Sequence, residues 1–114
     1  MVNFTREYLG TALWSSTDDD GEPLDDNYNA DDFSDEAIKR AAADCAAFLA
    51  RFEGDIGGSE SQAAHDLWLT RCHHGAGFWD GDWPEPLATR MTDYAHKIGE
   101  QWVYVGDDGM LYIG

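Results

Sequence analysis

The stretch from Thr17 to Glu36 contains ten Asp and Glu residues and not one Lys or Arg. Gly21 and Pro23 interrupt it, so it predicts a solvated acidic loop over about residues 17–33. The whole chain has 23 acidic and seven basic side chains, which give a formal net charge of −16 on 114 residues. Because that charge raises self-repulsion in a compact state, the chain either uses its negative field or folds where salt screens it.

The sequence has enough apolar material to form one core despite its charge. Hydrophobic residues make up 43% of it, with five Trp, five Tyr and five Phe, so global disorder is excluded. At this length we expect a single acidic globular domain over residues 1–114. There is no leader-like start and no run near the roughly 18 apolar residues of a membrane span, so we expect a soluble, intracellular protein. Its two cysteines fit a reducing compartment.

Apolar residues at helical spacing predict four helices. They are expected over about residues 3–15, 34–54, 59–74 and 85–98. Ser34 is the expected N-cap of the second helix, and Gly99 is expected to end the fourth. Ser59 and Gln62 form a capping-box pattern at the start of the third.

The last residues of the chain predict a β-hairpin. Two β-rich runs, Gln101–Val105 and Met110–Ile113, flank the turn sequence Gly106–Gly109. An isolated hairpin is marginal in water, so we expect this one to pack on the helices. The predicted fold class is therefore α+β, with about four helices packed together with a C-terminal β-hairpin.

The acidic loop does not match the calcium loop of an EF-hand. With Gly21 at the sixth position, the loop would end at Asn27, where a bidentate Glu is needed. Asp18, Asp20 and Asp25 could still bind calcium weakly, so a weak calcium-binding module stays open as an alternative.

A second group of possible metal ligands lies near the end of the third predicted helix and consists of His65, Cys72, His73 and His74. Closed zinc sites usually have paired ligands on both sides of a loop, and only one such side is present. Histidines that cap a helix C-terminus are the simpler interpretation. We therefore predict no metal and no cofactor.

No catalytic signature accompanies the charge. Asp66 beside His65, with serines nearby, supplies the residue types of a hydrolytic triad without a strained nucleophile turn or an oxyanion loop. We therefore predict that the protein is not an enzyme. Trp79 and Trp83 lie in a Gly-rich connection and are candidate exposed anchors for a protein partner.

The charge also limits the class of partner. Direct nucleic-acid binding needs Lys and Arg to replace counterions, and this chain has seven in total. Duplex DNA carries a negative charge about every 1.7 Å of its axis, so a rigid acidic protein can instead occupy a DNA-binding groove. The competing interpretation is solubility in high salt, since Asp outnumbers Glu by 16 to 7 and there are only two Lys.

Four segments carry a resemblance that spans most of the chain: Ala12–Asp25, His65–Arg71, His74–Asp80 and Tyr104–Gly109. In them the chain resembles a family of small acidic proteins encoded by tailed bacteriophages. That family has Asn-Gly in place of Cys72-His73, which weakens the case for zinc, and no activity carries over from it. The resemblance implies a phage accessory gene expressed in the host bacterial cytoplasm, where small acidic proteins often disable restriction or CRISPR machinery, sometimes by imitating DNA.

We therefore expect a phage-encoded, non-catalytic inhibitor of a host defence protein, of the anti-CRISPR or anti-restriction type. Its partner would be a basic host protein with an electropositive nucleic-acid-binding surface, which it would bind as an acidic DNA mimic. The alternative is a phage accessory or virion-associated protein whose acidity only maintains solubility. The residues expected to contact the partner are Asp18, Asp19, Asp20, Glu22, Asp25, Asp26, Asp31, Asp32, Trp79 and Trp83.

Overall fold

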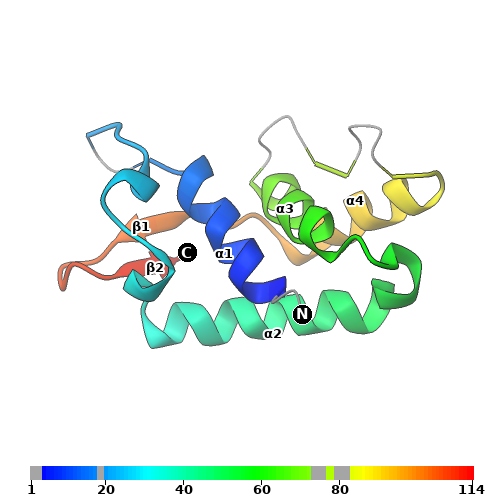
Figure 1. Cartoon of the computed structure of the whole chain (residues 1–114), viewed down its shortest axis with the longest axis horizontal. Coiled ribbons are helices and arrows are strands. Elements are labelled where there is room, and N and C mark those ends of the chain that lie inside the picture. Colours follow the sequence, from blue (N-terminus) through cyan, green and yellow to red (C-terminus); the bar gives the residue numbers. More distant parts are fainter. Residues whose placement is uncertain (1–3, 18–19, 73–76, 79–82) are drawn as a thin grey trace.

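Helices and one C-terminal hairpin make up the part of the chain that the computed structural model describes, which is residues 4–17, 20–72, 77–78 and 83–114 (Figure 1). In chain order the elements are α1 (Phe4–Ser15), the 3-10 helices η1 (Leu24–Asp26) and η2 (Ala30–Asp32), α2 (Asp35–Ile56), α3 (Glu60–Arg71), α4 (Leu87–Ile98), β1 (Val103–Val105) and β2 (Leu111–Ile113). The predicted α+β fold is confirmed.

Helix α2 lies along the long axis of the molecule, and the other helices pack on one side of it (Figure 1). Ser34 begins it as predicted, because its Oγ accepts a hydrogen bond from the Ala37 backbone N–H at 3.1 Å. The helix continues to Ile56, beyond the predicted end at Gly54, and stops at Gly57, whose φ of 56° favours glycine. Neither α2 nor any other helix in the described ranges combines the length and the apolar character of a membrane span.

The core is centred on aromatic rings around Phe48, which is fully buried on α2. The ring centroids of Phe4, Phe52, Phe78 and Tyr94 lie between 5.0 and 5.9 Å from that of Phe48. Aromatic pairs at this separation add to the stability gained from burial alone. These rings come from α1, α2, α4 and the segment after α3, so Phe48 joins distant parts of the sequence.

A buried polar network also joins the helices. Nη1 of Arg71 lies 2.8 Å from Oδ2 of Asp44 and 3.1 Å from the hydroxyl oxygen of Tyr8, and its Nε donates to the Gly99 carbonyl at 2.8 Å. The Tyr8 hydroxyl donates in turn to Oε1 of Gln101 at 2.6 Å. Burial raises the pKa of Tyr8 well above its ordinary value, so the hydroxyl stays a neutral donor.

Two predicted helix starts differ in detail. The capping box at α3 is wrong, because the Ser59 side chain makes no capping hydrogen bond. Gln62 instead donates through Nε2 to both carboxylate oxygens of Asp66 at 3.0 Å. Helix α4 begins at Leu87 rather than near Glu85, whose Oε1 accepts a hydrogen bond from the Thr89 backbone N–H at 2.8 Å from outside the helix.

The hairpin has the predicted turn, and it packs on α2. Its antiparallel register pairs Val103 with Ile113, Tyr104 with Tyr112 and Val105 with Leu111. Across the turn, the Gly106 N–H donates to the Met110 carbonyl at 2.8 Å. On the other edge of β2, the Ser34 N–H donates to the Leu111 carbonyl at 2.8 Å, and Phe33 forms a parallel bridge with Leu111. The end of the predicted acidic loop is therefore joined to the hairpin.

Candidate interaction surface

The acidic segment, residues 17–33, is anchored to the core near its middle and at its C-terminal end. Leu24 and Phe33 are each 1% exposed, and the Leu24 N–H donates to the Ser16 carbonyl at 3.0 Å. Between these anchors the Asn29 side chain accepts from the Asp31 N–H, while Asp32 accepts from the Asn29 N–H, both at 2.8 Å. These bonds cap η2, and the backbone bonds from Asp26 N–H to the Pro23 carbonyl and from Asn27 N–H to the Leu24 carbonyl form η1, where the sequence predicted a loop. The described part of the segment therefore holds its carboxylates in fixed places.

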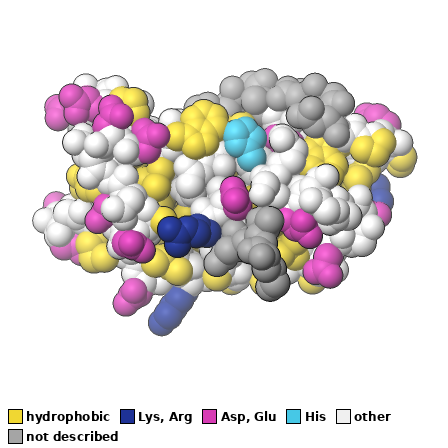
Figure 2. All heavy atoms as spheres, viewed as in Figure 1, with side chains coloured by type: hydrophobic (Ala, Val, Ile, Leu, Met, Phe, Trp, Pro, Cys, Tyr) yellow, Lys and Arg dark blue, Asp and Glu magenta, His cyan; other side chains and the backbone are white. Residues whose placement is uncertain are grey.

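The carboxylates of this segment are directed to solvent. Among those predicted to contact a partner, Asp20, Glu22, Asp25, Asp26 and Asp31 are exposed. In the described ranges, no Lys or Arg pairs with the carboxylates of η1 or with Asp31. Figure 2 shows acidic side chains gathered over this end of the molecule. The segment is thus a concentrated source of negative charge.

Three of the predicted contact residues lie outside the described part of the chain, and a fourth, Asp32, also caps a helix. Asp18, Asp19 and Trp79 lie outside the described residues. Asp32 is half-buried, because one of its carboxylate oxygens accepts the hydrogen bond that caps η2. Of the predicted contact carboxylates, those of η1, Asp31 and the turn before η1 are therefore described and exposed.

The predicted role of Trp83 as an exposed anchor is wrong. Trp83 is only 8% exposed, and its indole Nε1 donates to Oδ2 of Asp66 at 2.7 Å. Its ring also packs edge-on against Phe78, with centroids 6.2 Å apart. Asp66 is itself 2% exposed and needs such donors because a buried carboxylate without them is costly. Asp66 therefore holds the indole in the core.

Two other tryptophans are exposed, and neither was predicted to contact a partner. Trp14 at the end of α1 is 49% exposed and Trp102 before β1 is 56% exposed. The sequence did contain a signal for Trp102: it alternates with Val103 and Tyr104 at strand spacing, so Trp102 and Tyr104 share a face opposite the buried Val103. Tyr104 is 47% exposed.

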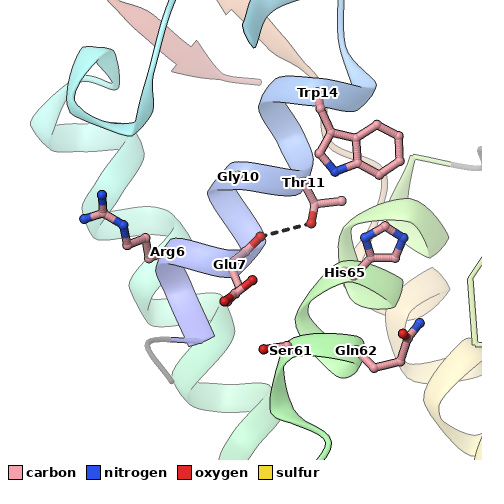
Figure 3. A pocket seen from close by; sticks show the side chains of 8 residues that line it. All are labelled: Arg6, Glu7, Gly10, Thr11, Trp14, Ser61, Gln62 and His65. Carbon is pink, nitrogen blue, oxygen red and sulfur yellow. Dashed lines mark hydrogen bonds between the residues drawn. The ribbon is translucent and has the colours of Figure 1, made fainter. Parts of the chain in front are cut away.

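A groove of about 570 Å³ is lined by residues of α1 and α3, which pack against each other (Figure 3). It is lined by Arg6, Glu7, Gly10, Thr11, Trp14, Ser61, Gln62 and His65. The rings of Trp14 and His65 stack with centroids 5.3 Å apart and planes 26° apart. The Thr11 hydroxyl donates to the Glu7 backbone carbonyl within α1. The Gln62 side chain donates to the Asp66 carboxylate within α3. The groove therefore combines an aromatic surface with polar side chains from both helices.

A second cavity, of about 470 Å³, contains a group of basic side chains on α2 and α4. Arg51, Arg90 and Lys97 are three of the seven basic residues in the chain. The guanidinium of Arg51 lies 5.5 Å from the ring centroid of Phe52 and 5.7 Å from that of Tyr94. Helix α4 and the C-terminal part of α2, which carry these residues, lie away from the acidic segment (Figure 1). Asp93 also lines this cavity, so its lining carries both signs of charge.

The group of possible metal ligands is only partly described. His65 stacks on Trp14, and Sγ of Cys72 donates to the Gln101 carbonyl at 3.2 Å. Burial raises the pKa of the Cys72 thiol to about 12, which disfavours the thiolate that a metal would need. His73 and His74 lie outside the described residues. Across the described ranges, no three His, Cys, Asp or Glu side chains are grouped so that they could hold a metal ion.

Comparison with known proteins found no matching family model, curated protein or solved structure. The resemblance to small acidic phage proteins therefore stays a prediction.

Proposed function

We propose that this protein is a non-catalytic binder of an electropositive, nucleic-acid-binding surface on another protein. The observation that carries the proposal is the anchored acidic segment. Its exposed carboxylates on η1 and η2 have no counter-charge in the described part of the chain. Such a surface attracts a basic partner and repels nucleic acid.

The buried anchors of the acidic segment favour its role as a specific contact surface over a role in which its acidity only maintains solubility. A solubilising charge works equally well on a disordered loop, whereas a contact surface gains affinity when its groups are already ordered. Leu24 near the middle of the segment and Phe33 at its end are buried, and Asn29 with Asp32 caps η2 between them. Spaced carboxylates held in this way can take the place of DNA phosphates in a basic groove.

The target class comes from the resemblance to tailed-phage proteins. A phage protein with this surface would act in the bacterial cytoplasm as an inhibitor of a host defence protein, of the anti-CRISPR or anti-restriction type. Binding to the groove that normally holds nucleic acid would inhibit by exclusion, so no catalytic residue is required. This proposal also fits the small number of basic residues, which disfavours direct binding to nucleic acid.

The experiment is capture from a bacterial lysate on the immobilised protein, followed by elution with salt or with duplex DNA. We expect captured proteins to bind nucleic acid, to be released by salt because the contact is electrostatic, and to be displaced by DNA because the surfaces compete. Capture that resists both salt and DNA would contradict the proposal. Failure to capture any nucleic-acid-binding protein would favour the solubility interpretation.

A further inference from the structure

The outer face of the hairpin is an exposed aromatic surface. Because side chains alternate across a strand, Trp102 and Tyr104 share this face with Met110 and Tyr112 of the paired segment, and we name these four residues the aromatic face. The opposite face of the hairpin carries Val103, Leu111 and Ile113, all buried. Trp102, Tyr104 and Met110 are 56%, 47% and 36% exposed. Trp, Tyr and Met are residue types enriched at protein interfaces.

The rings of the aromatic face are held in place from one side only. The Trp102 indole covers Gly114 and the Tyr112 ring covers Gly106, so closely that neither glycine could accept a Cβ atom unless the ring moved. Tyr104 stacks on Tyr112, with ring centroids 5.6 Å apart and planes 17° apart. Trp102 and Tyr104 therefore present their other ring surfaces to solvent while their positions are already fixed, which lowers the entropy cost of a contact.

Carboxylates lie beside Tyr112 of this face. Asp107 and Asp108 form the turn of the hairpin and are exposed. Asp108 accepts a hydrogen bond from the Tyr112 hydroxyl at 2.6 Å, and Glu36 at the start of α2 is close enough to Tyr112 to act on it electrostatically. The faces of aromatic rings attract cations, and neighbouring carboxylates add to that attraction. The surroundings therefore favour a cationic ligand group over a purely apolar one.

The acidic segment adjoins the hairpin that carries the aromatic face. The Ser34 N–H donates to the Leu111 carbonyl, and Phe33, the last residue of the segment, bridges to the same strand. Figure 1 shows the segment and the hairpin at the same end of the molecule. One partner surface can therefore contact both.

We infer that the aromatic face binds arginine side chains of the basic partner, with a guanidinium stacked on Trp102 and another on Tyr104. Residues two apart on one strand face are separated by about 7 Å, which is also the separation of alternate side chains on an extended partner segment. Arginine suits the site because its planar guanidinium stacks on rings while it bonds to carboxylates. This inference rests on the proposed function and names the chemistry of its partner.

The test uses a fluorescently labelled peptide of alternating Arg and Ser, with fluorescence anisotropy as the measure of binding. The reference peptides replace Arg by Leu or by Gln. We expect the Arg peptide to bind the wild-type protein most tightly. The double variant Trp102→Thr/Tyr104→Thr should weaken that binding by roughly tenfold, because two cation–ring contacts are lost.

A conservative variant separates this role from a structural one. Trp102→Phe/Tyr104→Phe keeps both rings and should retain most of the Arg-peptide affinity, while the Thr variant loses it. Circular dichroism in the aromatic region and the melting temperature check that both variants are folded. Equal affinity of the Thr variant and the wild type, or tighter binding of the Leu peptide than of the Arg peptide, would overturn the inference.

The acidic segment gives an independent control. The triple variant Asp25→Asn/Asp26→Asn/Asp31→Asn leaves the aromatic face unchanged and tests the proposed function. If this triple variant weakens peptide binding while the Thr variant does not, the proposed function survives and the inference about the aromatic face is wrong. If only the Thr variant weakens binding, the aromatic face is the arginine site and the assigned role of the acidic segment fails. If the Arg peptide does not bind the wild-type protein, the inference is wrong.

Discussion

Nη1 of Arg71 lies 2.8 Å from Oδ2 of Asp44, with the arginine side chain 3% exposed and the aspartate side chain 31% exposed. The same guanidinium donates to the Tyr8 hydroxyl and to the Gly99 carbonyl. It therefore links the end of α3 to α2, to α1 and to the segment that leads into β1. This arrangement positions the hairpin relative to the helices.

Removing this guanidinium should destabilise the protein strongly. Arg71→Ala leaves Tyr8 and a carbonyl without their donor inside the core, and we expect it to lower the free energy of unfolding by about 3–5 kcal/mol. Asp44→Asn keeps an acceptor oxygen beside the guanidinium and should cost only about 1–3 kcal/mol. Urea unfolding measures both. Equal losses for the two variants would show that the network does not depend on the arginine.

Phe48→Ala should be among the most damaging core substitutions. Phe48 is fully buried and contacts rings from α1, α2 and α4, so the cavity would cost about 3–5 kcal/mol. Lys39→Ala on the same helix is the control, because Lys39 is exposed and its loss should change stability by no more than about 0.5 kcal/mol. An unchanged melting temperature for Phe48→Ala would refute the packing described for α2.

The two cysteines should resist modification in the folded protein. Burial raises the pKa of the Cys45 thiol to about 12, and it does the same for Cys72. At mildly alkaline pH both therefore remain thiols, and the reactive thiolate is scarce. A thiol-reactive dye should label both quickly in denaturant and slowly in native buffer. Rapid labelling of Cys45 in the folded state would contradict its place in the core.

Asp108 should titrate below the ordinary range of an aspartate. The Tyr112 hydroxyl and then the Met110 N–H donate to its carboxylate, and these bonds lower its pKa. Since the pKa is lower in the folded state than in the unfolded state, the stabilisation is complete above the unfolded pKa and is lost as pH falls through the folded pKa. Carboxyl titration by NMR should give a higher pKa in Tyr112→Phe. No change in that variant would show that the hydroxyl does not bind Asp108.

The sequence predicted the elements whose signals are local. Ser34 caps α2, Gly99 follows α4 with a φ of 99°, and the glycines of the hairpin turn join two strands as expected. Each of these features depends on residues within a few positions. The periodic burial of α2, which includes Cys45 and Phe48, follows from its own spacing.

The features that the sequence did not predict depend on distant contacts. Trp83 is buried because Asp66, 17 residues earlier, accepts from its indole, and nothing near Trp83 indicates that partner. The acidic segment has two short helices because Leu24 and Phe33 are buried against the rest of the fold. For Trp102, strand spacing indicates the face, but its exposure depends on which side of the hairpin packs on the helices.

The measurement that tests the proposed contact most directly is the rate of association with a captured nucleic-acid-binding protein at low salt. The test variant is Asp25→Asn/Asp26→Asn/Asp31→Asn. The matched control, Glu53→Gln/Asp55→Asn/Glu60→Gln, removes the same charge near the other end of the molecule. We predict that the test variant associates roughly tenfold more slowly than the wild type, since surface charge controls encounter, while the control changes the rate by less than about twofold. Equal rates for the two variants would contradict a specific role for the acidic segment.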